Sequence, residues 1–140
     1  MNDFLLSKLC SQILLSLKDI HNPKLKEILT DLITENLEPK SEIVSQMPSY
    51  HQELQHSLEH FPDQTNSFQK DTAFLSNKVL WHEGSRGVPE FFNGGYSFSE
   101  VIGKSGLYHH DYLKLGLYLQ AASIDYPAHA HEAEECYLIL

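Results

Sequence analysis

Two imidazoles near the end of the chain have a spacing that suits metal binding. His129 and His131 flank a single alanine. Alternate residues of a β-strand point to the same face, so on a strand both imidazoles lie on one face. Glu135 and Tyr137 have the same spacing on the strand expected next. If residues 132–134 connect the two strands and the strands pair antiparallel, the imidazoles, the carboxylate and the phenol meet.

This set of donors predicts a site for one divalent transition metal ion. Imidazole nitrogen and carboxylate oxygen suit Fe, Mn, Co, Ni or Zn, and three protein ligands leave positions open for substrate or water. We therefore expect His129, His131 and Glu135 to be the ligands. The alternative is that both histidines are exposed polar residues of an ordinary strand. Glu132 and Glu134 are weaker ligand candidates, because they fall in the turn or out of phase. Cys136 points to the apolar side of the strand with Leu138 and Leu140.

Short strands are expected to position these residues. Leu113, Leu115, Leu117 and Leu119 alternate with less apolar residues, which predicts a strand over 113–120 with one leucine face. Further strands are expected at the two segments that carry the metal ligands. Glycine-containing turn signals separate short apolar runs upstream of these segments. The turn signals lie at 84–87, 93–95 and 103–106, and the further strands are expected at 126–131 and 135–140.

The first 62 residues are expected to form three helices. Apolar residues recur at three- and four-residue steps from Phe4 to Ile20, which is the spacing of one helical face. Asn22 and Pro23 are typical of a helix start. A third apolar stripe over 50–61 has a capping-box spacing in front of it, formed by Ser49 and Gln52.

The domain organisation follows from these segments. Residues 1–62 form the helical region, and residues 63–111 contain a linker and the first strands. Within that part, residues 63–71 are expected to be a polar linker, and residues 72–81 to be a helix or a strand. Residues 112–140 carry the metal motif.

The charge and the cysteine content of the chain indicate which partners and which cellular location to expect. The 140 residues include 10 Lys+Arg and 19 Asp+Glu, a net charge of −9, which argues against nucleic acid or an anionic membrane as partner. Residues 1–20 lack the basic start and uninterrupted apolar run of a signal peptide. Cys10 and Cys136 are the only thiols and suggest no disulfide framework, so we expect a cytoplasmic protein.

The end of the chain resembles a known family. The spacing His129-x-His131-x-x-x-Glu135 resembles the first metal motif of the cupin superfamily. The longer segment 126–140, with 115–121 before it, resembles the cupin-type dimethylsulfoniopropionate (DMSP) lyases of the DddL and DddQ kind. This resemblance implies an α+β fold in which N-terminal helices precede a cupin (double-stranded β-helix) barrel. It also implies a small-molecule substrate, and it permits a homodimer.

The resemblance assigns a role to each residue of the motif. His129, His131 and Glu135 become the metal ligands, Tyr137 the catalytic base and Tyr126 a second active-site phenol. The implied reaction is a β-elimination that cleaves DMSP to dimethyl sulfide and acrylate. A phenol acting as base has to be ionised, so its pKa has to fall by about 2 to 3 from its ordinary value of about 10.

Two departures and two alternative functions accompany the resemblance. The general cupin motif has glycine where this chain has Ser123, and the family's fourth ligand, a histidine, is expected beyond Leu140. On this interpretation the chain stops within the barrel. The alternatives are another metal-dependent cupin enzyme, such as an oxygenase or isomerase, and a non-enzymatic ligand-sensing cupin. Tyr126 and Tyr137 favour the lyase over an oxygenase, and the scarcity of basic residues argues against a DNA-binding regulator.

Overall fold

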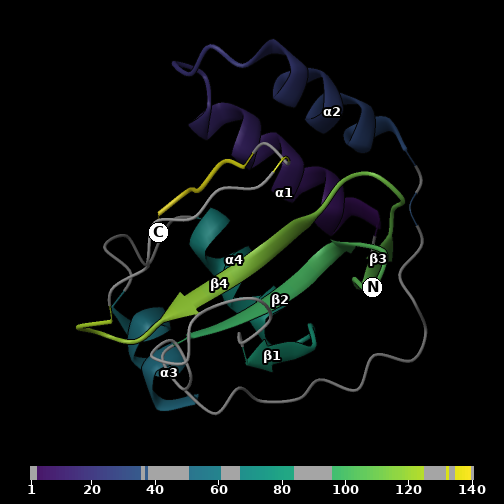
Figure 1. Cartoon of the computed structure of the whole chain (residues 1–140). Helices are drawn as coiled ribbons and strands as arrows, with labels where there is room; N and C mark the ends of the chain where they lie inside the picture. The colour runs from purple at the N-terminus through teal and green to yellow at the C-terminus, as the bar shows by residue number, and fades with distance from the viewer. Residues whose placement is uncertain are drawn as a thin grey trace.

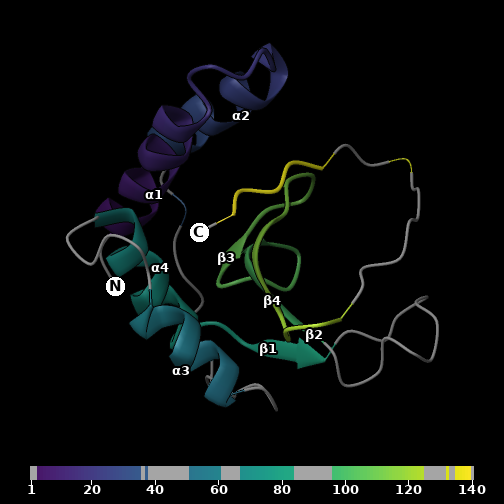
Figure 2. The ribbon, with the colours of Figure 1, turned by 90° about the vertical axis from the view of Figure 1, so that its left-hand side faces the viewer.

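The computed structural model describes residues 3–35, 37, 51–60, 67–83, 96–124, 132 and 135–139. Within these ranges the chain has an α+β fold, with helices gathered on one side of a twisted sheet (Figure 1, Figure 2). The helices are α1 (Asp3–Ser16), α2 (Pro23–Thr34), α3 (His51–Glu59) and α4 (Ser67–Ser76). The strands are β1 (Trp81–Glu83), β2 (Tyr96–Gly103), β3 (Tyr108–His109) and β4 (Leu115–Gln120).

Strand β2 is the centre of the sheet. It pairs antiparallel with β4 along most of its length and antiparallel with β1 over residues 97–99. The short strand β3 runs parallel to the end of β2, so β1 and β3 share the edge of β2 opposite β4. The turn between β2 and β3 lies at Gly103 to Gly106, as the sequence predicts, and Gly103 has a φ of 149°, which favours glycine.

The two faces of the sheet differ in burial. The leucines of β4 alternate as predicted: Leu115 and Leu117 are half-buried and Leu119 is 8% exposed, whereas Tyr118 between them is 38% exposed. Ser97 and Ser99 of β2 lie opposite Leu119 and Leu117 and are buried. This leucine face therefore turns toward the core, and the residues between the leucines form the outer face.

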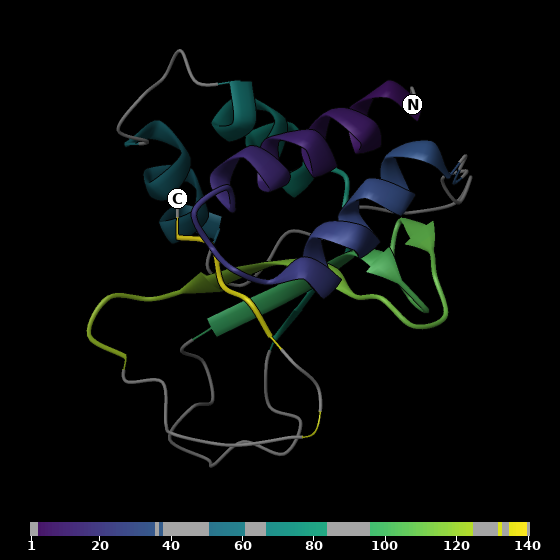
Figure 3. The ribbon, with the colours of Figure 1, turned by 90° about the horizontal axis from the view of Figure 1, so that it is seen from above.

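The N-terminal helices pack with α1 in the middle, between α2 and α4 (Figure 3). Asn22 caps α2 as expected, because its Oδ1 accepts a hydrogen bond from the Leu25 backbone N–H at 2.9 Å and Pro23 follows it. The Ser7 hydroxyl of α1 donates to the Ile33 carbonyl of α2 at 3.3 Å. These contacts fix the pair α1 and α2 as one layer above the sheet.

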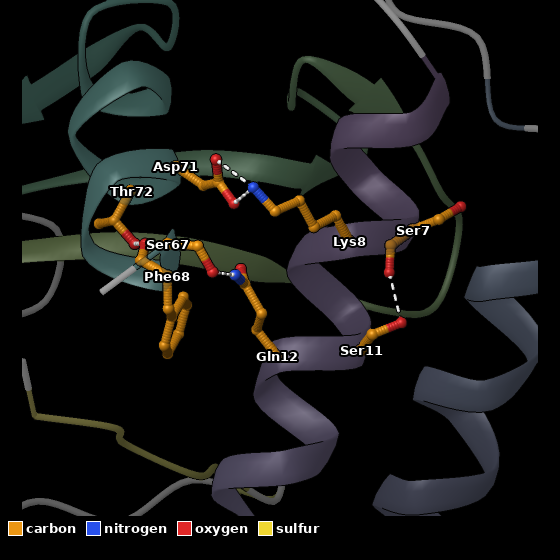
Figure 4. A network of polar contacts seen from close by, with 8 residues as sticks. All are labelled: Ser7, Lys8, Ser11, Gln12, Ser67, Phe68, Asp71 and Thr72. Carbon is orange, nitrogen blue, oxygen red and sulfur yellow. Dashed lines mark hydrogen bonds and ion pairs between the residues drawn. The ribbon is translucent and has the colours of Figure 1, made fainter. Parts of the chain in front are cut away.

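A polar network connects α1 to α4 (Figure 4). The Lys8 Nζ atom lies 2.8 Å from Asp71 Oδ2 and 3.1 Å from Asp71 Oδ1. One turn further along α1, the Gln12 side-chain amide lies 2.5 Å from Ser67 Oγ. Both contacts join residues more than fifty positions apart, so they orient α4 against the first helix.

One hydrophobic core joins the helices to the sheet. Its aliphatic residues come from all four helices and from β2 and β4, and Trp81 closes it at β1 by donating its indole N–H to the Ser76 carbonyl at 2.8 Å. The core residues are Leu6, Leu9, Cys10, Leu17, Leu29, Leu32, Leu54, Leu75, Val79, Trp81, Val101, Ile102, Leu107, Tyr108 and Leu119.

The structure corrects several sequence predictions. Helix α4 begins at Ser67, so the end of the segment expected as a polar linker is helical. The leucine strand begins at Leu115 and not at Leu113, although Leu113 still packs against the core. The strand predicted over 135–140 is wrong for 135–139, which are not in a strand. The described strands form an open four-stranded sheet and not a closed barrel.

Some predictions concern residues that the structure does not describe. The strand predicted over 126–131, the capping serine Ser49 and the first two glycine turns lie outside the described residues. Among the described helices, none has the length and apolarity needed to cross a membrane.

Candidate functional site

Glu135 and Tyr137, the two predicted site residues that the structure describes, contact each other. The Tyr137 hydroxyl donates a hydrogen bond to Glu135 Oε2 at 2.9 Å. The two residues are separated by one position, so in an extended segment their side chains leave on the same side. The sequence predicted this shared face, and the hydrogen bond agrees with it.

The surroundings of this pair differ from the prediction. Tyr137 is 58% exposed, and Cys136, which was expected to point into an apolar layer, is exposed as well. Leu138 is 40% exposed and Ile139 94%. An apolar layer needs a second surface to cover it, and for residues 135–139 the described part of the chain provides none. The apolar side of this segment, with Cys136 and Leu138, is therefore exposed in this structure.

The other predicted site residues cannot be placed against this pair. Tyr126, His129 and His131 lie in the segment 125–131, outside the described residues. Within the described ranges, no three His, Cys, Asp or Glu side chains gather in a way that would hold a metal ion. Of the three predicted ligands, Glu135 alone belongs to those ranges.

The chemistry of the Tyr137 and Glu135 pair fits a nearby cation. When the phenol is neutral, its proton satisfies the carboxylate, as the structure shows. When the phenol is ionised, two negative charges face each other across the same 2.9 Å. Like charges at this separation oppose ionisation unless a positive charge lies close to both. A divalent ion at the metal site that the sequence predicts would meet that need.

A second group of side chains, which the sequence analysis missed, covers the outer face of the sheet. We call Tyr96, Phe98, Tyr118 and His82 the aromatic face. Phe98 of β2 lies opposite His82 of β1 on one side and opposite Tyr118 of β4 on the other. The ring centroids of His82 and Phe98 are 5.5 Å apart, and those of Tyr96 and Tyr118 are also 5.5 Å apart. The period of two in Tyr96-x-Phe98 was the available signal, but only the strand register shows that the rings meet.

Two charged residues flank the aromatic face. The Lys114 Nζ atom lies 5.8 Å from the centroid of the Phe98 ring, within the range of a cation–π contact. The same ammonium group lies 3.4 Å from Glu100 Oε2. Glu100 is also held from the other side, because its Oε1 accepts a hydrogen bond from the Ser105 backbone N–H at 3.1 Å.

A shallow pocket of 260 Å³ adjoins this end of the sheet. Glu100 and Lys114 line it together with the loop that precedes β4. The loop is held by His110, whose Nδ1 accepts hydrogen bonds from the backbone N–H groups of Tyr112 at 3.2 Å and Leu113 at 2.9 Å. Because Nδ1 accepts both bonds, the proton of the neutral ring is on Nε2.

The buried thiol is not a nucleophile candidate. Cys10 is fully buried in the core, and burial raises its pKa to about 11. A thiol with such a pKa stays protonated at neutral pH, and the thiolate is the reactive form. Cys10 therefore has a packing role.

Comparison with known proteins assigns the chain to a family. Residues 21–140 match the family described as dimethylsulfoniopropionate lyase. The matched region includes α2 to α4, the whole sheet, and all five predicted site residues. Searches of curated proteins and of solved structures gave no match. Since the family match extends over most of the sequence, the chain belongs to the DMSP lyases, enzymes that cleave dimethylsulfoniopropionate.

Proposed function

We propose that this enzyme is a metal-dependent DMSP lyase that uses Tyr137 as its base. The family match supports DMSP as the substrate. The observation that carries the assignment of the base is the 2.9 Å hydrogen bond between the Tyr137 hydroxyl and Glu135. It places a phenol directly beside a carboxylate that is predicted to bind the metal, and so beside the positive charge that ionisation of the phenol requires.

The proposed reaction is a β-elimination. The Tyr137 phenolate removes a proton from the carbon next to the substrate carboxylate. The electron pair of that C–H bond becomes the carbon–carbon double bond, and the C–S bond breaks with its electron pair going to sulfur. The products are acrylate and neutral dimethyl sulfide, while Tyr137 ends as a neutral phenol. Because the leaving group is neutral, no strong acid is needed to assist its departure.

His129, His131 and Glu135 are the residues that would hold the metal ion. A divalent ion bound there would supply positive charge that stabilises the phenolate and the developing charge on the substrate. Its identity among Fe, Mn, Co, Ni and Zn is left open by the donor set. Tyr126, close to the histidines in the sequence, is proposed as a second phenol that contacts the substrate.

The proposal includes a cupin barrel around these residues and a cytoplasmic location. Both rest on the sequence: the barrel on the resemblance of the motif at 126–140, and the location on the free thiols Cys10 and Cys136. The observed sheet of β1 to β4, with the motif directly following β4 in the chain, is compatible with the first strands of such a barrel.

The test is release of dimethyl sulfide from DMSP, measured by gas chromatography. We expect the protein to release it and Tyr137→Phe to lower kcat by at least about 100-fold, the usual size of a lost general base. The metal content, measured by mass spectrometry, should stay the same because the substitution removes one hydroxyl and no proposed ligand.

Thr30→Val is the control for this test. It removes a hydroxyl group at an exposed position of α2, outside the pocket and the predicted site, so it should leave activity unchanged. Near-normal turnover in Tyr137→Phe would assign the base to another residue. Loss of metal together with activity would show that the phenol is a ligand.

A further inference from the structure

We propose that the aromatic face of the sheet binds the dimethylsulfonium end of the substrate, with Tyr118 and Phe98 as the contacting rings. This inference rests on the proposed function, because it takes DMSP as the ligand. It concerns binding and specificity, whereas the base and the metal ligands are located on the segment after β4.

The position of the rings supports the proposal. Phe98 and Tyr118 are directly opposite each other on β2 and β4, and their side chains stand on the face turned away from the leucine core. Tyr118 is 38% exposed, so a ligand can reach its ring. The Tyr118 hydroxyl donates to Gln120 Oε1 at 2.9 Å, which orients the ring on its own strand.

The chemistry of the ligand matches aromatic rings better than polar groups. A dimethylsulfonium group carries a positive charge but no N–H or O–H, so it cannot donate a conventional hydrogen bond. Its charge is stabilised by the negative faces of aromatic rings, as for other methylated cations, and its methyl groups gain from apolar contact. The aromatic face offers both within one patch.

A cation already occupies this environment in the structure. The Lys114 ammonium lies 5.8 Å from the Phe98 ring centroid and 3.4 Å from the Glu100 carboxylate. The Phe98 ring face and the Glu100 carboxylate therefore provide negative potential at this edge, which favours a bound cation. A pocket of 260 Å³, which Glu100 and Lys114 help to line, adjoins this edge of the aromatic face.

In the sequence, the aromatic face comes shortly before the residues proposed for catalysis. Tyr118 lies on β4, and Tyr126 and the histidines of the metal motif follow β4 directly in the chain.

The experiment compares two inhibitors of the same shape that differ only in charge. They are 3-(trimethylammonio)propanoate, which is cationic at the methylated end, and 4,4-dimethylpentanoate, which is neutral there. Their dissociation constants are measured by titration calorimetry on the whole protein and on its variants. The ratio of the neutral to the cationic constant isolates the contribution of the charge.

We expect Tyr118→Leu to lower this ratio about three- to tenfold, which is the range of one cation–π contact. Tyr118→Phe keeps the ring and should keep the ratio. Phe98→Leu should act like Tyr118→Leu, and Phe74→Leu, an equal change at an exposed position of α4, should leave the ratio unchanged. Equal melting temperatures would show that each variant is folded.

The outcomes separate this inference from the proposed function. If the wild-type protein releases dimethyl sulfide but Tyr118→Leu and Phe98→Leu keep the wild-type ratio, the sulfonium site is wrong and the lyase assignment stands. If the ratio falls as expected while no dimethyl sulfide is released, the cation site stands and the proposed reaction is wrong.

Discussion

The chain has one thiol in its core and one on its surface, and the two should behave differently. Cys10 belongs to the hydrophobic core, whereas Cys136 is exposed. Burial disfavours the charged thiolate of Cys10 and raises its pKa from 9.0 to about 11. Because the Cys10 thiol has a higher pKa in the folded protein than in the unfolded chain, the free energy of unfolding depends on pH.

We expect the free energy of unfolding to fall as the pH rises from about 9 to about 11. Below that range the thiol is protonated in both states, so its contribution is fully present. Within it the unfolded chain loses the Cys10 proton while the folded protein keeps it, which favours unfolding by up to about 2 to 3 kcal/mol. Urea denaturation as a function of pH measures this loss.

Two variants identify the group responsible. In Cys10→Ala the free energy of unfolding should fall less steeply with pH, although the variant is less stable at every pH because the substitution leaves a cavity. Cys136→Ala removes the exposed thiol and should keep the wild-type slope. Equal slopes in all three proteins would show that Cys10 is not the titrating group.

At the scale of the elements, the pairing of β2 with β4 depends on a glycine. Gly116 lies opposite Glu100, and a Cβ atom built on Gly116 would be 2.2 Å from the Ser99 carbonyl oxygen. That oxygen belongs to the backbone, so it cannot rotate away as a side chain would. The two strands can approach this closely only because residue 116 has no side chain.

Gly116→Ala should destabilise the protein by about 2 kcal/mol, because a methyl group has to push the two strands apart. Thermal unfolding followed by circular dichroism measures the change. Ala122→Ser adds one heavy atom at an exposed position just after β4 and should have almost no effect. A Gly116→Ala protein as stable as the wild type would mean that the strands are further apart than observed.

At the scale of the whole molecule, α1 is joined to α4 by an ion pair between distant parts of the sequence. The side chain of Asp71 is 14% exposed and that of Lys8 is 35% exposed, so water screens the pair only in part. The two residues are 63 positions apart. Their contact exists only when the helical layer is assembled, so its energy reports on the tertiary structure.

A double-mutant cycle of Lys8→Met and Asp71→Leu should give a coupling energy of about 1 kcal/mol. The free energy of unfolding of the wild type, both single variants and the double variant provides this value. The exposed pair His109 and Asp111, with 57% and 66% exposed side chains, is the control, and its cycle should give a value near zero. Equal coupling in both cycles would refute a special role for the α1 to α4 contact.

Local sequence patterns predicted the parts of this fold that depend on neighbouring residues. The start of α2 at Asn22 and Pro23 depends on one capping hydrogen bond within four residues. The leucine face of β4 follows from the period of two in the strand. The spacing of Glu135 and Tyr137 predicted that their side chains share one side of the chain, and the motif around them indicated the family that the comparison then showed.

Tertiary structure decided the features that depend on partners far along the chain. A pattern of alternating residues shows which side chains share a face, but it does not say which strand lies beside it. The sequence therefore predicted a strand at 135–139 where none is found, missed the meeting of Tyr96 with Tyr118, and treated the start of α4 as a linker. Strand pairing and helix packing are contacts between segments, and their free energy is gained only when both segments are in place.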